Sequence, residues 1–155
     1  MTDKIIHSEK LEKHETKDIT NQRVNGFLTV LWRDWDNKFP IVPKMIYTTT
    51  VFSGERKGPH LHKKRDSFFV CIHGKVVFVI KDKFGKYHEI ISSEENPTMI
   101  HVPNNIASGH VNLTNHTSTV LTIANLAWRP NDNEMINVDF DDYDWDKWKN
   151  NVKKI

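Results

Sequence analysis

The sequence predicts an all-β protein, folded as an antiparallel sandwich or jelly-roll barrel with one short helix at its C-terminal end. Short apolar runs rich in Val, Ile, Thr, Phe and Tyr follow one another from residue 26 onward, and such residues suit a pleated, half-buried surface. Turn residues separate the runs, and helical periodicity is confined to the end of the chain. The runs are Gly26–Trp32, Met45–Phe52, Ser67–Ile72, Lys75–Ile80, Met99–Val102 and Thr119–Trp128.

Length and composition set the class of protein. The 155 residues correspond to one domain, and 22 basic against 20 acidic residues leave a formal charge of +2. This near balance predicts neither a nucleic-acid partner nor a membrane-surface partner. No run approaches the eighteen apolar residues of a membrane span, and the N-terminus lacks the apolar centre of a secretory signal. With Cys71 as its one cysteine, the chain is expected in the cytoplasm, without a disulfide framework.

The order of segments divides the chain into three parts. Residues 1–22 are polar and rich in lysine, without a sustained apolar period, and predict a loose N-terminal arm or an edge element. Residues 23–138 carry the strand-like runs and predict the barrel itself. Within it, the turn signals His73-Gly74 and Phe84-Gly85 join neighbouring runs so closely that both predict hairpins.

Residues 139–155 predict an acidic turn followed by an amphipathic helix. Trp145, Trp148, Val152 and Ile155 recur at steps of three and four residues, the spacing of one helical face. Aspartates crowd the start of this segment and lysines its end, an arrangement that suits the helix dipole. We expect the helix to pack its tryptophans onto the barrel.

The stretch between Gly54 and Gly74 carries the residues most suited to chemistry. If it is a strand, His60 and His62 project to one face and Leu61 to the other, because side chains alternate with period two. Two imidazoles on the concave face of a small barrel can bind a metal ion or move protons near neutral pH. The alternative is that both are surface histidines in a loop rich in Lys and Arg.

This stretch resembles the first signature of the cupin superfamily. That signature has a glycine, five residues, His-x-His, three or four further residues, an acidic residue, about six more residues and a second glycine. Gly54, His60, His62 and Gly74 match it, and Asp66 stands near the acidic position with seven residues before the glycine.

The second cupin signature is matched in part. Pro103 and Asn112 fit it, but Ser108 occupies its histidine position and His110 lies two residues further on. Metal-dependent cupins usually employ three histidines and a carboxylate, so the resemblance implies no bound metal here. A set completed by Asp66 and His110 remains the alternative.

A narrower resemblance is to the nucleotide-sugar 3,4-ketoisomerases, small cupins related to the dTDP-sugar 3,5-epimerases. It rests on Gly58–Lys64, Phe69–Gly74 and Val77–Asp82, with weaker likeness over residues 24–146. Downstream of residue 100 the chain looks more like the epimerases. In those enzymes a tyrosine on a late strand acts as an acid, and Thr122 is the nearest match here.

The resemblance implies a substrate and a mechanism. The substrate is a dTDP-4-keto-6-deoxyhexose, whose C3 proton is acidic because it lies next to the C4 ketone. The resemblance implies His62 as the base and His60 as its partner or acid, with the two roles exchangeable. Lys57 or Arg56 is then the cation that stabilises the enediolate.

The remaining predicted site residues are substrate contacts. Tyr47 is predicted to meet the sugar or phosphate, with a barrel-wall aromatic as the alternative. Arg33 is predicted to meet the pyrophosphate, with a surface salt bridge as the alternative, and His101 and His110 are predicted to face the substrate from later strands. The resemblance further implies no cofactor, and a homodimer that exchanges N-terminal strands. The alternatives are a 3- or 3,5-epimerase, a metal-dependent cupin enzyme and a non-catalytic sugar-nucleotide binding protein.

Overall fold

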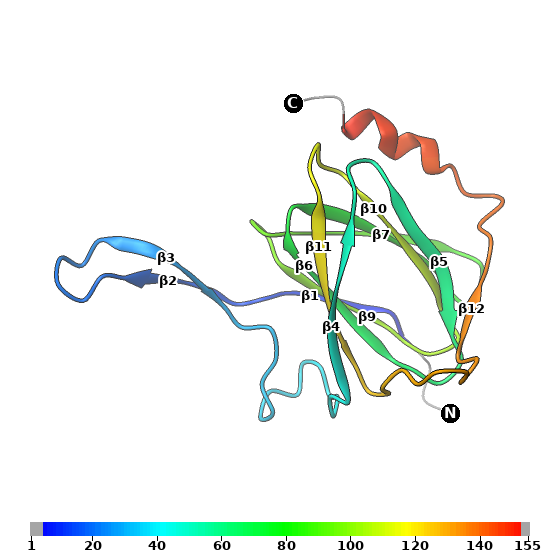
Figure 1. The fold of residues 1–155 in the computed structure, drawn as a ribbon, viewed down its shortest axis with the longest axis horizontal. Helices are drawn as coiled ribbons and strands as arrows, with labels where there is room; N and C mark the ends of the chain where they lie inside the picture. Colours follow the sequence, from blue (N-terminus) through cyan, green and yellow to red (C-terminus); the bar gives the residue numbers. More distant parts are fainter. Residues whose placement is uncertain (1–4, 153–155) are drawn as a thin grey trace.

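The computed structural model describes residues 5–152, which form two five-stranded antiparallel sheets packed face to face (Figure 1). The first sheet has the order β1 (His7–Lys10), β9 (Thr98–Val102), β6 (Ser67–His73), β11 (Ser118–Ala124) and β4 (Met45–Val51). The second has the order β12 (Met135–Asn137), β5 (Arg56–His62), β10 (Ala107–Asn112), β7 (Lys75–Lys81) and β8 (Tyr87–Ser93). Successive strands cross repeatedly between the sheets, which confirms the predicted jelly roll.

The core lies between the two sheets. Val76, Phe78 and Ile80 of β7 project inward and meet Ile100 and Val120 of the opposite sheet. A second apolar layer covers the outer face of the first sheet, where the irregular segment 30–44 packs over it. The strands β6, β9 and β11 of the first sheet are therefore largely buried on both faces.

The predicted hairpin at Phe84-Gly85 is confirmed, but the one at His73-Gly74 is wrong. β7 pairs with β8 around the first of these turns, whereas β6 and β7 belong to different sheets. Gly74 forms the corner between the sheets with φ = 77°, and a Cβ there would lie 2.2 Å from Oγ of Ser118. Glycine is needed here because the backbone is left-handed and passes close to Ser118. A glycine in a turn is also typical of a hairpin, so the sequence does not distinguish a corner between sheets from a hairpin.

The N-terminal region contains an edge strand and a projecting hairpin. β1 pairs with β9, and the chain then leaves the barrel as a two-stranded hairpin of β2 (Lys13–Lys17) and β3 (Val24–Thr29) (Figure 1). The predicted boundary between residues 22 and 23 falls in the turn of this hairpin. Val24, Phe27 and Leu28 on β3 are each at least half exposed.

The C-terminal segment folds back onto the second sheet. Its 3-10 helix η1 (Trp145–Asn151) places Trp145 and Trp148 against Val77, Val111 and Leu113. This confirms a short helix that packs its tryptophans on the barrel, while Ile155 lies outside the described residues. Among residues 5–152, no helix is long and apolar enough to cross a membrane.

Candidate active site

A cleft of about 580 Å³ lies beside the 125–134 loop. This loop runs along the end of the barrel opposite the C-terminal helix (Figure 1). The cleft takes side chains from both sheets, from the turn after β5 and from the loop that leads into β12. Its lining residues are Met45, Tyr47, His62, Arg65, Trp128, Asn131, Asp132, Asn133, Glu134 and Met135.

His62 has a polar partner on each ring nitrogen. Its Nδ1 lies 2.6 Å from Oε2 of Glu134, and its Nε2 lies 2.6 Å from Nη2 of Arg65. A guanidinium can only donate hydrogen bonds, so Nε2 carries the lone pair and Nδ1 carries the proton. His62 is therefore a neutral imidazole whose basic nitrogen faces the arginine.

Glu134 is fixed by the backbone as well as by His62. Its Oε1 accepts hydrogen bonds from the backbone amides of Lys64, at 3.1 Å, and Arg65, at 2.9 Å. Burial raises the pKa of this carboxyl, but the hydrogen bonds from His62 and from the two amides outweigh burial and hold it below the usual value. Glu134 is thus a carboxylate that orients His62 in the manner of a catalytic dyad.

The surroundings of His62 favour a neutral base. Burial lowers the pKa of His62 most strongly; the hydrogen bond to Glu134 opposes this effect, and the positive charge of Arg65 adds to it. The net direction is downward, so the imidazole is unprotonated at neutral pH. A histidine in this state can accept a proton from an acidic C–H group.

His60 lies on the same strand and is held by β12. It pairs with Asn137 in the sheet, and its Nδ1 lies 3.0 Å from Oδ1 of that asparagine. The amide oxygen accepts the hydrogen bond from Nδ1, and His60 is not among the side chains that line the cleft. His60 and His62 are close enough for the charge of His60 to lower the pKa of His62.

Tyr47 and Arg65 join the first sheet to the histidine strand. Tyr47 lies on β4, and its hydroxyl accepts a hydrogen bond of 3.2 Å from Nη2 of Arg65. Sequence reasoning omitted both Arg65 and Glu134. Arg65 ends a Lys-Lys-Arg run typical of exposed loops, and Glu134 follows an Asn-Asp-Asn turn, so neither carries a local signal of burial.

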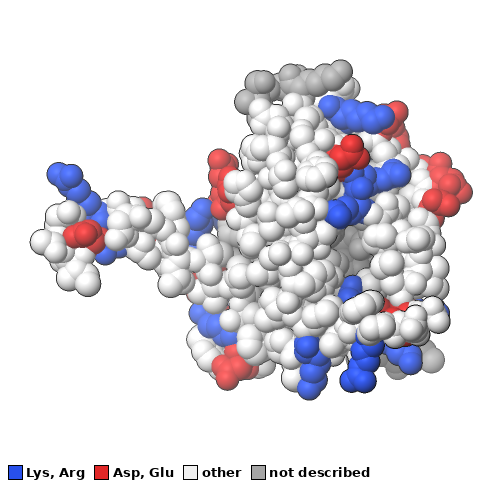
Figure 2. Space-filling view, viewed as in Figure 1, with Lys and Arg blue, Asp and Glu red and all other residues white. Residues whose placement is uncertain are grey.

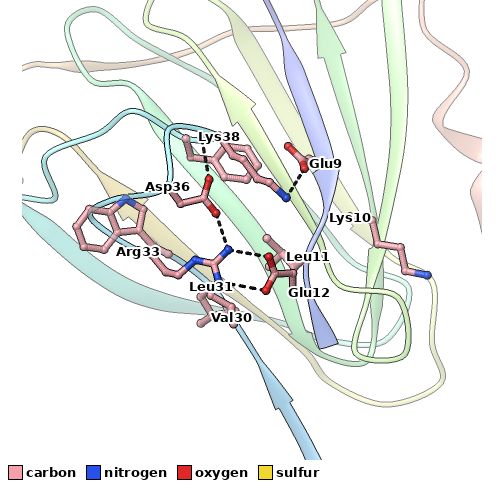
Figure 3. Close-up of a pocket in the computed structure, with 11 residues that line it drawn as sticks. Glu9, Lys10, Leu11, Glu12, Val30, Leu31, Arg33, Asp36 and Lys38 are labelled. Carbon is pink, nitrogen blue, oxygen red and sulfur yellow. Dashed lines mark hydrogen bonds and ion pairs between the residues drawn. The ribbon is translucent and has the colours of Figure 1, made fainter. Parts of the chain in front are cut away.

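Arg33 does not line this cleft. Its guanidinium binds both carboxylate oxygens of Glu12, at 2.7 and 3.1 Å, and Asp36 at 2.8 Å (Figure 3). These ion pairs join the start of the irregular segment 30–44 to the chain just after β1. Within the described chain, Arg33 therefore stabilises the packing of this segment and lies outside the cleft that contains His62.

Arg56, Lys57 and His101 also lie outside the lining of the cleft. Arg56 stacks over the ring of Trp145 with its guanidinium carbon 4.4 Å from the ring centre, and Lys57 is exposed opposite His110 on β10. His101 pairs with His7 of β1, and its ring stacks on Phe68 at 4.3 Å on the outer layer of the first sheet. The cation beside His62 is Arg65.

His110 is buried inside the barrel. Its ring packs against Phe78 at 4.8 Å, and within the described part of the chain its Nε2 has no hydrogen-bond partner. Burial lowers its pKa to about 4, and the charges of Lys57 and His60 act in the same direction. The structure thus separates His110 from the partnered histidines of β5 and keeps it neutral.

The burial of His110 predicts acid sensitivity. The unfolded state, with a pKa near 6.5, binds the proton more readily, so this stabilisation is complete above about pH 6.5 and is lost as pH falls towards 4. We expect the loss to reach about 3 kcal/mol of unfolding free energy, given a folded pKa of about 4. Urea titrations of wild type and His110→Phe between pH 7 and 4 measure it. A His110→Phe protein whose stability falls as steeply as that of wild type would contradict the prediction.

The residues around His62 do not fit a metal ion. No group of three or more His, Cys, Asp or Glu side chains among residues 5–152 is arranged to hold one. Both nitrogens of His62 are engaged, one of them by a cationic guanidinium. Asp66 instead accepts hydrogen bonds from the backbone and the side chain of Asn104.

Positive charge gathers beside the cleft. Figure 2 shows Lys and Arg side chains along the end of the barrel where the 125–134 loop lies. A neighbouring cleft of about 330 Å³ shares Asp132–Glu134 with the first and is lined by Lys63, Lys64 and Arg129. These side chains give the surroundings of the cleft a net positive charge that suits an anionic ligand.

Comparison with known proteins identifies the family. Residues 9–144 match the family described as FdtA: WxcM-like, C-terminal. The chain belongs to this family. No curated protein matched the sequence.

Solved structures share the fold of this family member. QdtA, a sugar 3,4-ketoisomerase from Thermoanaerobacterium thermosaccharolyticum solved with TDP, is 18% identical with a TM-score of 0.68; the match covers 99% of this chain and 98% of QdtA. A 3,4-ketoisomerase from Helicobacter canadensis is 19% identical over 92% and 93% of the chains, with a TM-score of 0.67. A dTDP-4-dehydrorhamnose 3,5-epimerase from Sulfolobus tokodaii is 20% identical over 90% and 80%, with a TM-score of 0.75. At these identities, the likeness establishes the cupin fold.

Proposed function

We propose that the protein is a nucleotide-sugar isomerase that moves the ketone of a dTDP-4-keto-6-deoxyhexose from C4 to C3. The observation that carries the proposal is the Glu134–His62 dyad with its unprotonated Nε2 in an open cleft. Membership of the WxcM-like family and the fold shared with sugar 3,4-ketoisomerases support the choice of reaction. The basic residues beside the cleft suit a diphosphate.

The reaction needs only proton transfers. His62 Nε2 removes the proton from C3, the C3–H electron pair forms a C3=C4 double bond, and the C4 oxygen takes the negative charge. The proton of the 3-hydroxyl passes to the C4 oxygen, which moves the negative charge to the C3 oxygen. C4 then receives a proton as the C3–O bond becomes a carbonyl, which leaves a ketone at C3 and a hydroxyl at C4. Substrate and product are isomers, so the chemistry requires no oxidant or reductant.

The other site residues complete the scheme. His60, held by Asn137 on the same strand, is proposed as the acid that returns a proton to the ring. Tyr47 is proposed to contact the sugar from the opposite sheet. The cation on the enediolate is proposed to come from the lining of the cleft, which includes neither Arg56 nor Lys57.

Identification of the product tests this proposal against its alternatives. Purified protein is incubated with dTDP-4-keto-6-deoxyglucose, and carbon NMR locates the ketone in the sugar ring. A 3-keto product supports ketoisomerisation. A product that keeps its 4-keto group but is inverted at C3 or C5 identifies an epimerase, and binding of dTDP without any change identifies a binding protein.

We also propose that the protein is a homodimer. An isolated two-stranded hairpin is marginally stable in water. The β2–β3 hairpin nevertheless projects from the barrel (Figure 1), and Val24, Phe27 and Leu28 of β3 are each at least half exposed. β4 is an open edge of the first sheet, and its Ile46 is 61% exposed. Packing of the hairpin against a second copy would bury these surfaces and pair an open edge.

This proposal predicts that Phe27→Asp produces monomers, because a carboxylate at that position would be buried in the dimer. Light scattering of wild type is expected to give the mass of two chains, and the variant the mass of one. Phe84→Asp is the matched control, since Phe84 is 82% exposed at the β7–β8 turn, away from the hairpin. A monomeric wild type, or a Phe27→Asp protein that stays dimeric, would contradict the proposal.

A further inference from the structure

We infer that Arg65 is the group that stabilises the negative charge on the C4 oxygen during catalysis, and that in the free protein the same guanidinium covers the base nitrogen of His62. The inference rests on the proposed function and adds a catalytic residue to it. Arg65 takes the role that sequence reasoning gave to Arg56 or Lys57.

The position of the guanidinium is the first argument. Nη2 of Arg65 lies 2.6 Å from Nε2 of His62 and 3.2 Å from the hydroxyl of Tyr47, so it lies between the proposed base and a proposed sugar contact. The side chain lines the cleft although the residue is only 8% exposed. A cation that is both buried and open to the cleft meets a ligand with little competition from water.

The second argument is that the positive charge of Arg65 has no carboxylate partner among the described residues. Both oxygens of Glu134 are engaged, one by two backbone amides and the other by His62. Within the described chain no ion pair joins Arg65 to a carboxylate, and its buried Nε has no hydrogen-bond partner. A buried cation without a carboxylate partner is costly, whereas it would gain strongly from an oxyanion. Arg65 is therefore arranged for an anion that the free protein lacks.

The geometry of the reaction is the third argument. For Nε2 of His62 to take the C3 proton, the substrate must occupy the place where Nη2 of Arg65 now lies. The C4 oxygen is attached to the adjacent carbon, so the displaced guanidinium is within reach of it. As the C3–H bond breaks, its electron pair forms the C3=C4 bond and the charge moves to this oxygen. A cationic donor next to such a developing charge stabilises the transition state.

The change of hydrogen-bond partner at Arg65 also controls when His62 can act as a base. While Arg65 donates to Nε2, the lone pair is occupied, and the positive charge opposes protonation of the ring. When Arg65 turns to the C4 oxygen, the lone pair is released next to C3. Binding of the ketosugar, rather than of dTDP alone, thus uncovers the base.

Kinetics of Arg65→Met test the inference. We expect kcat to fall by about 10²- to 10³-fold while calorimetric affinity for dTDP stays within a few-fold, because the lost interaction belongs to the transition state. Arg65→Gln, which keeps a donor for Tyr47, replaces it if the methionine variant does not fold. An unchanged kcat would overturn the inference, as would a comparable loss in Arg56→Met but not in Arg65→Met.

NMR titration of His62 provides a second readout in the free protein. Removing Arg65 takes away a positive charge and a donor to Nε2, so the pKa of His62 is expected to rise. The other polar groups that face His62 stay in place: Glu134, Tyr47 and Asp132 line the cleft, and His60 acts on His62 through its charge. If the pKa of His62 in Arg65→Met were unchanged or lower, Arg65 would not cover Nε2 of His62 in the free protein. Wild type assayed in parallel separates the two proposals: inactivity of wild type on the ketosugar refutes the proposed function, whereas an active wild type with an equally active Arg65→Met refutes only the role of Arg65.

Discussion

Replacing His62 with asparagine is expected to lower turnover of the ketosugar by roughly 10³-fold or more, because the variant has no basic nitrogen to remove the C3 proton. Asparagine is similar in size and keeps a polar group towards Glu134, so affinity for dTDP should stay within a few-fold of wild type. Steady-state kinetics and calorimetry on the same preparation measure the two effects separately.

His88→Asn is the matched control for this prediction. His88 also forms a histidine–carboxylate pair, at 2.8 Å from Asp82, but it lies on β8 and does not line the cleft. The His88→Asn variant is expected to turn over the ketosugar at the wild-type rate. If His62→Asn kept a rate close to that of wild type, His62 would not be the base and His60 would take that role.

Replacing Glu134 with glutamine is expected to lower kcat by about 10²-fold, because a neutral amide neither fixes the tautomer of His62 nor stabilises its protonated form. The pH profile should move as well. Glu134 raises the pKa of His62, so its loss lowers that pKa further. The acidic limb of kcat/KM, which reports protonation of the free base, should shift to lower pH while the plateau falls.

Glu94→Gln controls for the loss of a histidine–carboxylate pair as such. Glu94 lies 2.9 Å from Nδ1 of His73, and this pair is exposed and outside the cleft. We expect its kcat and pH profile to match those of wild type. A Glu134→Gln protein with a wild-type plateau and an unmoved acidic limb would show that the carboxylate does not act through His62.

The sequence predicted the sheets better than the connections between them. Runs such as Lys75–Ile80 are apolar because both faces are buried, and they coincide with β7. The strands β5 and β10 lack that signal, because Gly58, Pro59 and Gly109 interrupt them where their backbones approach closely. The corner at Gly74 was misread because the partners of β6 and β7 are distant in sequence, and a local turn signal does not identify them.

The site was predictable only where it follows a strand motif. The alternation of His60 and His62 on one strand can be read directly from the sequence. Glu134 reaches His62 across 72 residues, through the antiparallel pairing of β12 with β5, and no local pattern indicates that contact. Arg33 and His101 have residue types suited to a site, but the fold places them in an ion-pair cluster and an outer apolar layer.

Exchange of solvent deuterium into the sugar ring tests the central claim most directly. Proton NMR follows dTDP-4-keto-6-deoxyglucose in D2O with wild type and with His62→Asn. The mechanism predicts that wild type produces a 3-keto sugar whose C4 carries solvent deuterium, because the base and the acid are different residues. It predicts that His62→Asn leaves both carbons unexchanged. Wild type that binds dTDP but neither exchanges ring protons nor moves the ketone would contradict the assignment of His62 as a catalytic base.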